Sequence, residues 1–134
     1  MNYCADTWFI LSLFHKNQQS LKLLQETRSG KTRIVIPMTV FAEATRKLLQ
    51  QGMPHLILTQ FWDGVEDFSD KVQLILLDKA IADEAARIST TFSLSLIDAC
   101  NAASCKLTGC HTLLTSDSDY DSLVKRKYLS TQAW

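Results

Sequence analysis

Residues 113–120 read Leu-Leu-Thr-Ser-Asp-Ser-Asp-Tyr, an apolar run that stops abruptly in a cluster of acids. Residues 95–99, Ser-Leu-Ile-Asp-Ala, place a further acid at the start of an apolar helix. A strand that ends in acids brings its carboxylates to the carboxyl edge of the sheet, where open α/β sheets bind their ligands. The two stretches therefore predict one half of a metal site, containing Asp98, Asp117 and Asp119.

The length and composition suit one folded domain. The 134 residues are 46% hydrophobic, which is enough to bury a core, and they predict a single domain over residues 1–134. Fourteen Lys and Arg balance 14 Asp and Glu, so the chain lacks the overall basic charge that would announce a nucleic-acid binder. Any binding to nucleic acid would have to rely on local basic patches or on metal.

The N-terminus and the cysteines predict a cytoplasmic protein. Met1 leads directly into a strand-like segment without a basic signal region, and no apolar run approaches the ~20 residues that span a bilayer. The four cysteines contain no Cys-x-x-Cys pair. Buried thiols in a reducing compartment are therefore favoured over zinc or disulfides, and no membrane contact is expected.

Short strands alternate with helices along the chain. Strands are expected at residues 2–5, 33–36, 72–77 and 111–115, with an edge strand in the tail from 128 to 134. Helices are expected at 8–14, 20–28, 39–51, 54–62, 79–90, 96–107 and 118–125, with Thr39 and Asp78 as N-caps and a break at Asp63-Gly64. This alternation predicts an α/β protein with a short, mainly parallel sheet covered by helices.

Two earlier acids extend the candidate set, although each has an ordinary structural explanation. Asp6 follows the first strand and opens a helix, so it suits an N-cap. A parallel sheet would also bring Asp6 to the carboxyl edge, where the expected strand 111–115 ends just before Asp117. Glu43 lies four residues before Lys47, which is the spacing of an ion pair on a helix. The sequence leaves both interpretations open.

The acids of the opening stretch also fit helix caps. Asp98 completes a Ser-x-x-Asp capping box with Ser95, but a capping role does not exclude a metal role. Asp121 is explained by the cap of the short helix that follows and drops out of the set. Asp117 and Asp119 precede it and bring like charges close together, a cost that a bound cation would relieve.

The inward stripe of helix 96–107 is expected to comprise Leu96, Cys100, Ala103 and Leu107.

Four motifs, in order and at suitable spacing, resemble the PIN domain. They are a first strand ending in Asp-Thr, then Pro-x-Thr-x-x-x-Glu at 37–43, Ser-Leu-x-Asp-Ala at 95–99 and Leu-Leu-Thr-x-Asp-x-Asp-Tyr at 113–120. The resemblance covers essentially the whole chain and is strongest to the toxins of VapBC-type toxin–antitoxin pairs and their stand-alone relatives. It implies a Rossmann-like α/β/α sandwich and a Mg²⁺- or Mn²⁺-dependent endoribonuclease. It also implies an RNA substrate, a small antitoxin partner and a homodimer.

The resemblance assigns roles to particular residues. Matched by motif, the family's catalytic and metal-binding acids fall on Asp6, Glu43, Asp98 and Asp117, with Asp119 as a frequent extra carboxylate. One metal would be held mainly by Asp6, Asp98 and Asp117, and a second, weaker one near Glu43 and Asp119, for metal-assisted phosphodiester hydrolysis. Thr115 resembles the polar helper that holds the site by hydrogen bonding.

Two departures from the family's pattern leave an alternative open. The family usually has Thr-Asn or Thr-Ser after the first acid, whereas Trp8 follows Thr7 here, and Asn101 stands where an apolar residue is common. Asn101 could supply the polar contact that Trp8 removes. The alternative is a PIN-like module of weakened activity that binds RNA or protein. A receiver-like phospho-acceptor domain is disfavoured, because the chain lacks paired acids after the first strand and a lysine after a late strand.

Local basic residues would have to hold an RNA substrate, because the formal net charge is zero. The candidates form three groups: Arg28, Lys31 and Arg33; Arg46 and Lys47; and Lys125, Arg126 and Lys127. Phosphate contacts by any of these groups would make the affinity for RNA fall as salt rises.

Overall fold

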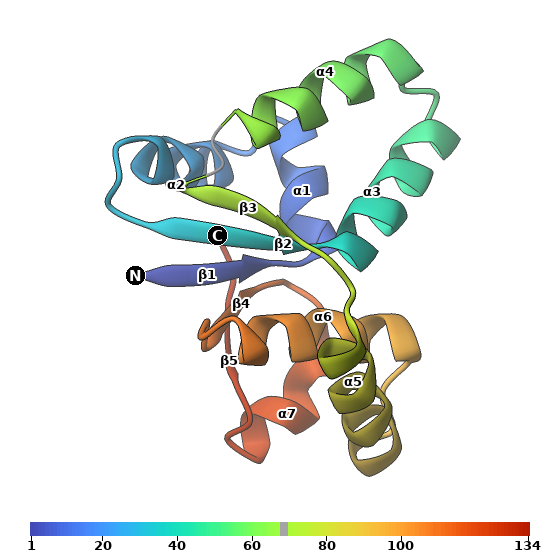
Figure 1. The fold of residues 1–134 in the computed structure, drawn as a ribbon. Helices are drawn as coiled ribbons and strands as arrows, with labels where there is room; N and C mark the ends of the chain where they lie inside the picture. The colour runs from blue at the N-terminus through green and yellow to red at the C-terminus, as the bar shows by residue number, and fades with distance from the viewer. Residues whose placement is uncertain (68–69) are drawn as a thin grey trace.

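Residues 1–67 and 70–134, which the computed structural model describes, form a five-stranded parallel sheet between two layers of helices (Figure 1). The strands are β1 (Asn2–Ala5), β2 (Arg33–Pro37), β3 (Val72–Ile75), β4 (Thr112–Leu114) and β5 (Ser130–Gln132). The helices are α1 (Thr7–Phe14), α2 (Gln18–Arg28), α3 (Met38–Gln50), α4 (His55–Glu66), α5 (Lys79–Phe92), α6 (Leu96–Leu107), the 3-10 helix η1 (Ser118–Tyr120) and α7 (Asp121–Lys125). The predicted α/β/α sandwich with a parallel sheet is confirmed.

The strand order is β3-β2-β1-β4-β5, with every pairing parallel. From β1 the chain moves outward in one direction to β2 and β3, and then returns to the other side of β1 for β4 and β5. The order therefore reverses between β1 and β4. Ligands of open α/β sheets bind at the carboxyl ends of the strands at such a reversal.

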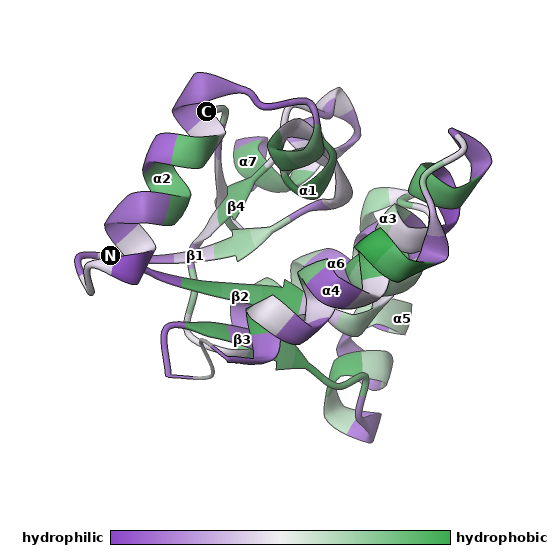
Figure 2. Ribbon diagram, turned by 90° about the horizontal axis from the view of Figure 1, so that it is seen from above, coloured by the Kyte–Doolittle hydropathy of each residue, from purple (hydrophilic) through white to green (hydrophobic). Residues whose placement is uncertain are grey.

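Side chains alternate across each strand and so reach both layers of helices. In β1, Tyr3 and Ala5 belong to a hydrophobic cluster with α1 to α4, whereas Cys4 belongs to the cluster with α5, α6 and α7. Figure 2 shows the hydrophobic colouring of β2 between the helices. Asp6 continues the alternation of Cys4, and its carboxylate accordingly meets Asn101 of α6.

The predicted ends of α4 and β3 are wrong. α4 passes through Gly64 and ends at Glu66, because Val65 packs against the hydrophobic cluster and offsets the ~1 kcal/mol cost of a helical glycine. β3 ends at Ile75, two residues earlier than predicted, and the two leucines that follow it are exposed.

The start of α3 also differs from the prediction. The helix begins at Met38 with Pro37 at the N-cap position, so the predicted Thr39 cap is wrong. Proline is well suited to this place because its missing N–H would have no partner in a helix. The Thr39 hydroxyl instead donates to Asn101 Oδ1. The predicted Asp78 cap of α5 is present, since Asp78 Oδ1 accepts the Ile81 N–H at 2.9 Å.

α6 is buried along its middle rather than along one stripe. Every residue from Ala99 to Cys105 is buried. Leu96 and Leu107, predicted to point inward, are 60% and 50% exposed. The helix packs against the sheet and against α5, so a one-sided apolar pattern does not describe it. As a result Asn101 is fully buried and needs hydrogen-bond partners.

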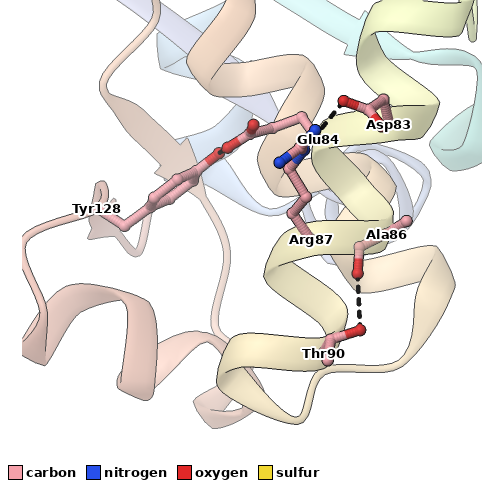
Figure 3. Close-up of polar contacts among 6 residues, drawn as sticks. All are labelled: Asp83, Glu84, Ala86, Arg87, Thr90 and Tyr128. Carbon is pink, nitrogen blue, oxygen red and sulfur yellow. Dashed lines mark hydrogen bonds and ion pairs between the residues drawn. The ribbon is translucent and has the colours of Figure 1, made fainter.

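α5 is joined to the C-terminal segment by a polar contact (Figure 3). Tyr128 lies between α7 and β5, and its hydroxyl donates to Glu84 Oε1 at 2.8 Å. Asp83 and Arg87, one turn apart on α5, form an exposed ion pair with a 3.0 Å N–O distance. Tyr128 precedes β5, so this contact lies toward the amino edge of the sheet, opposite the predicted site.

The four cysteines, all in the described part of the chain, are buried free thiols, as predicted. Burial raises the pKa of the Cys4 and Cys100 thiols, so they remain protonated and pack as small apolar groups. Among the residues that the structure describes, no helix combines the length and hydrophobicity needed to cross a bilayer.

Candidate metal centre

Four of the five predicted acids, Asp6, Asp98, Asp117 and Asp119, approach one another at the carboxyl edge of the sheet, where the strand order reverses. Asp6 follows β1, and Asp6 N–H donates to Leu114 O at 3.1 Å, which extends the β1–β4 pairing up to this acid. Asp117 follows β4, Asp119 lies in η1 and Asp98 in the first turn of α6. Carboxylate oxygens of Asp98, Asp117 and Asp119 lie within 4.8 Å of one another. Three acids thus converge from two segments.

Asp6 is 2% exposed and is held by side chains rather than by a helix cap. It stands at the N-cap position of α1, but within the described residues its carboxylate accepts no capping hydrogen bond. Thr115 Oγ1 donates to Asp6 Oδ2 at 2.7 Å, and Asn101 Nδ2 donates to Asp6 Oδ1 at 3.3 Å. A capping role therefore does not explain this acid.

Thr115 connects Asp6 to the acidic loop. Its hydroxyl donates to Asp6 and accepts the Asp117 N–H at 3.0 Å. Asp117 Oδ1 in turn accepts the Asp119 N–H at 2.9 Å. The position of the buried carboxylate is therefore coupled to that of the loop by consecutive hydrogen bonds.

Tyr120 connects Asp6 to Asp98 and is a site residue that the sequence did not reveal. Its hydroxyl lies 3.3 Å from Asp6 Oδ1 and 3.1 Å from Asp98 Oδ1, and accepts from Asn101 Nδ2 at 3.3 Å. Thr39, predicted as a cap, is a second one, because its hydroxyl holds the Asn101 amide. A tyrosine that follows Asp-x-Asp fits a core position equally well. The only signal in the sequence was the place of Tyr120 at the end of the Asp-x-Asp-Tyr motif.

Asp98 serves both as part of a helix start and as part of the cluster. Its N–H donates to Ser95 Oγ at 3.2 Å, which is the predicted cap of α6. Its carboxylate accepts from Tyr120 and is half-buried near Asp117 and Asp119. The capping contact uses the backbone of Asp98 and leaves a carboxylate oxygen for another partner.

Glu43 lies beside the site without joining the three converging acids. In the described structure it forms no ion pair with Lys47, whose ammonium lies 5.0 Å from the centroid of the Trp8 ring. Burial is the main cause of the raised pKa of Asp6, and the charge of Glu43 adds to it. The ordinary explanation of Glu43, a helical ion pair, is therefore not the one that the structure shows.

Burial and neighbouring acids favour protonation of Asp6. Burial raises the pKa of Asp6 to about 6, and the charges of Asp98 and Glu43 add to the effect. Hydrogen bonds from Thr115 and from the Thr7 backbone oppose it. A carboxylate in this position is costly to ionise unless a positive charge is brought close to it.

Asp98 and Tyr120 are shifted in the same direction. Burial raises the pKa of Asp98, against hydrogen bonds from Ser95 and Tyr120 and with the charges of Asp117 and Asp119. Burial also raises the pKa of Tyr120, and the charges of nearby Asp6 and Asp98 raise it further. The Tyr120 hydroxyl therefore keeps its proton and acts as a hydrogen-bond donor.

The donor set fits a hard divalent cation. Its side chains offer carboxylate oxygens, the ligands that Mg²⁺ and Mn²⁺ prefer in proteins. Thr7, next to Asp6, is buried, and its Oγ1 has no hydrogen-bond partner among the described residues. A buried hydroxyl without a partner indicates that a water or another group completes its surroundings. The three crowded acids suit a hydrated ion.

Of the three basic groups predicted from the sequence, which all lie in described residues, one shares the edge of the acids. Lys31 and Arg33 lie at the start of β2, and Lys127 precedes β5, so these groups lie toward the amino edge. Arg46 and Lys47 lie on α3, which leaves the carboxyl end of β2. Only this last group is placed to meet a ligand of the acidic cluster.

The fold and the acidic cluster define a class, an α/β protein with a carboxylate site at the switch point of a parallel sheet. The model of the PIN domain family matches residues 3–125. The chain therefore belongs to the PIN domain family, as the sequence motifs predicted. No match was found among curated protein sequences.

Solved structures with the same fold agree with this membership. VapBC2 from Rickettsia felis, in a crystal structure with a DNA fragment from their promoter, has a TM-score of 0.71 at 16% identity and covers 100% of this chain and 99% of that chain. VapBC-1 from nontypeable Haemophilus influenzae has a TM-score of 0.66 at 19% identity, over 100% and 98%. A toxin–antitoxin complex from Klebsiella pneumoniae gives 0.68 at 16% identity, over 88% and 89%. At these identities the likeness is one of fold.

Proposed function

We propose that the chain is a metal-dependent endoribonuclease of the VapBC-toxin kind, which hydrolyses phosphodiester bonds in RNA. The observation that carries this proposal is the convergence of Asp98, Asp117 and Asp119 within 4.8 Å beside buried Asp6. Membership of the PIN domain family and the similarity to structures of toxin–antitoxin proteins support it.

The carboxylates of the site would have different roles in binding Mg²⁺ or Mn²⁺. Asp98, Asp117 and Asp119 would be the principal ligands, with Asp6 completing the set and Glu43 beside it. A divalent ion held by these residues would supply Lewis acidity, lowering the pKa of a bound water and offsetting the negative charge of the phosphate. Thr115 and Asn101 keep the Asp6 carboxylate in one orientation.

The proposal is tested by RNA cleavage with Mg²⁺ or Mn²⁺. We expect the wild-type protein to cut single-stranded RNA and EDTA to abolish the cutting. Asp98→Asn should lower the rate about 100-fold or more, because it removes a charged ligand from the reacting centre. Asp83→Asn is the matched control, since Asp83 is an exposed aspartate on α5 whose partner is Arg87.

Equal rates for wild type and Asp98→Asn would refute the assignment. RNA or metal binding by the wild type without any cleavage would favour the alternative, a PIN-like binding module of weakened activity.

We also infer an antitoxin partner and a homodimer. The similar structures of a VapBC pair and of a toxin–antitoxin complex support the first of these. Exposed apolar side chains that could meet a partner include Leu49 of α3 and Leu56 and Ile57 of α4. Co-purification with the product of a neighbouring small reading frame tests the partner, and light scattering of the isolated chain tests the dimer.

A further inference from the structure

A fully connected polar network lies inside the protein behind the acidic cluster. Asn101 of α6 and Tyr120 of η1 are both fully buried, and their polar atoms contact each other and the buried Asp6. Burying an amide and a phenol in a core costs free energy unless every polar atom finds a partner. Apolar side chains of similar size would fill the same space without this requirement, so the network needs a reason beyond packing.

The direction of the hydrogen bonds follows from their partners. The Asn101 amide oxygen accepts the Thr39 hydroxyl, so the amide nitrogen faces Asp6 and Tyr120. A flipped amide would turn its oxygen toward the Asp6 carboxylate. Because Asn101 donates to the Tyr120 oxygen, the single Tyr120 proton remains free for a carboxylate, and Asp98 Oδ1 at 3.1 Å is its nearer acceptor.

This arrangement determines which way two carboxylates face. Asp6 Oδ2 accepts a hydrogen bond from Thr115, and Asp6 Oδ1 accepts one from Asn101. Asp98 Oδ1 accepts a hydrogen bond from the Tyr120 hydroxyl. This bond keeps the Asp98 carboxylate turned inward although the residue lies at an exposed helix start. The charges of the neighbouring acids would otherwise push Asp98 outward, toward solvent.

We propose that Tyr120 and Asn101 are positioning residues that hold the Asp6 and Asp98 carboxylates ready for a divalent ion and thereby set the affinity of the site for it. The inference rests on the proposed function, because it presumes that the acids bind a metal. Groups that orient metal ligands by hydrogen bonds typically change metal affinity about 10- to 100-fold when removed.

The test is calorimetric titration of the metal-free protein with Mn²⁺. Tyr120→Phe keeps the ring and removes the hydroxyl, and we expect it to weaken Mn²⁺ binding about 10- to 100-fold. Tyr128→Phe is the matched control, because it also removes a tyrosine hydroxyl bound to a carboxylate, that of Glu84, away from the acids. The control should bind Mn²⁺ as the wild type does.

A second variant, Asn101→Leu, removes the amide at similar volume and should weaken Mn²⁺ binding to a similar extent. If Tyr120 and Asn101 act through the same hydrogen-bond network, the double variant should bind Mn²⁺ little worse than either single variant. Thermal unfolding in EDTA shows which variants are folded, so a Tyr120→Phe protein that failed to fold would leave Asn101→Leu to decide.

The outcomes separate the two proposals. Wild type that binds Mn²⁺ while both folded variants bind it equally well overturns the positioning role and leaves the proposed function standing. Wild type that binds no Mn²⁺ overturns the metal centre itself. A loss of affinity in Tyr128→Phe as large as that in Tyr120→Phe would attribute the effect to general loosening and would also overturn the positioning role.

Discussion

Asp6 is the residue where stability and the proposed chemistry oppose each other. Burial raises its pKa from 3.8 to about 6, so the folded, metal-free protein holds a proton there more tightly than the unfolded chain does. The stability gained from that proton is fully present below about pH 4 and is lost as pH rises through about 6. At neutral pH the folded protein therefore carries an unfavourable buried charge, which a bound cation would neutralise.

Asp6→Asn should accordingly stabilise the metal-free protein at pH 7.5. The interval from 3.8 to about 6 corresponds to a gain of up to about 3 kcal/mol. The gain should shrink toward zero near pH 4, where the aspartate itself becomes neutral. Thermal unfolding in EDTA at pH 4, 5.5 and 7.5 measures it, with Asp83→Asn as the exposed control. A gain that is the same at every pH would contradict the buried charge as its cause.

The acids of the site could be predicted from the sequence, but the residues that hold them in place could not. Asp98, Asp117 and Asp119 stand in or beside recognisable motifs, and strand-end acids in a parallel sheet must reach one edge. Thr39 and Tyr120 each have a commoner use, as a cap and as a core aromatic. Their hydroxyls acquire a role only when three separate segments meet, and sequence spacing contains no information on that meeting.

α6 is the element on which the site depends, because it supplies Asp98 in its first turn and Asn101 one turn later. The order of that first turn comes partly from Ser95, whose hydroxyl oxygen accepts the Asp98 N–H. A loss of this cap acts on helix stability and on a proposed metal ligand at the same time.

Ser95→Ala should therefore lower the free energy of unfolding by about 1 kcal/mol and also weaken Mn²⁺ binding. The matched control is Asn17→Ala, which removes the N-cap of α2, where Asn17 Oδ1 accepts from Gln19 and Ser20. It should cost similar stability in a urea titration but leave Mn²⁺ affinity unchanged. If Ser95→Ala loses stability and retains full Mn²⁺ affinity, the cap does not help to position Asp98.

The ends of the elements show why the pattern of the sequence predicted most helices but misplaced some boundaries. α6 was predicted with its observed ends because Ser95 and Gly109 mark them. α4 was cut short because glycine is a poor helix former, whereas the packing of Val65 carries the helix through Gly64. Tertiary contacts overrode local preference there, as they did for the buried middle of α6.

The parallel sheet has an amino edge and a carboxyl edge, and the common direction of its strands decides which residues lie at each. Alternating strands and helices predicted a parallel sheet, but the sequence could not give the order β3-β2-β1-β4-β5, which depends on where each crossover packs. That order places Asp6 next to the loop after β4. The direction of β2 separates the basic groups, since Lys31 lies before this strand and Lys47 lies on the helix after it.

An RNA held at the acidic edge should therefore contact Lys47 and not Lys31. The Lys47 ammonium lies over the ring of Trp8, which follows Asp6 by two residues in the sequence. Its positive charge is therefore placed to contact a phosphate beside the acidic cluster. Lys47→Ala should weaken RNA binding in EDTA and reduce the slope of log affinity against log salt by about 1. Lys31→Ala removes an equal charge from the opposite edge and should change neither quantity. If both variants lose the same affinity, RNA binding follows overall charge, and the separation of the two edges does not direct it.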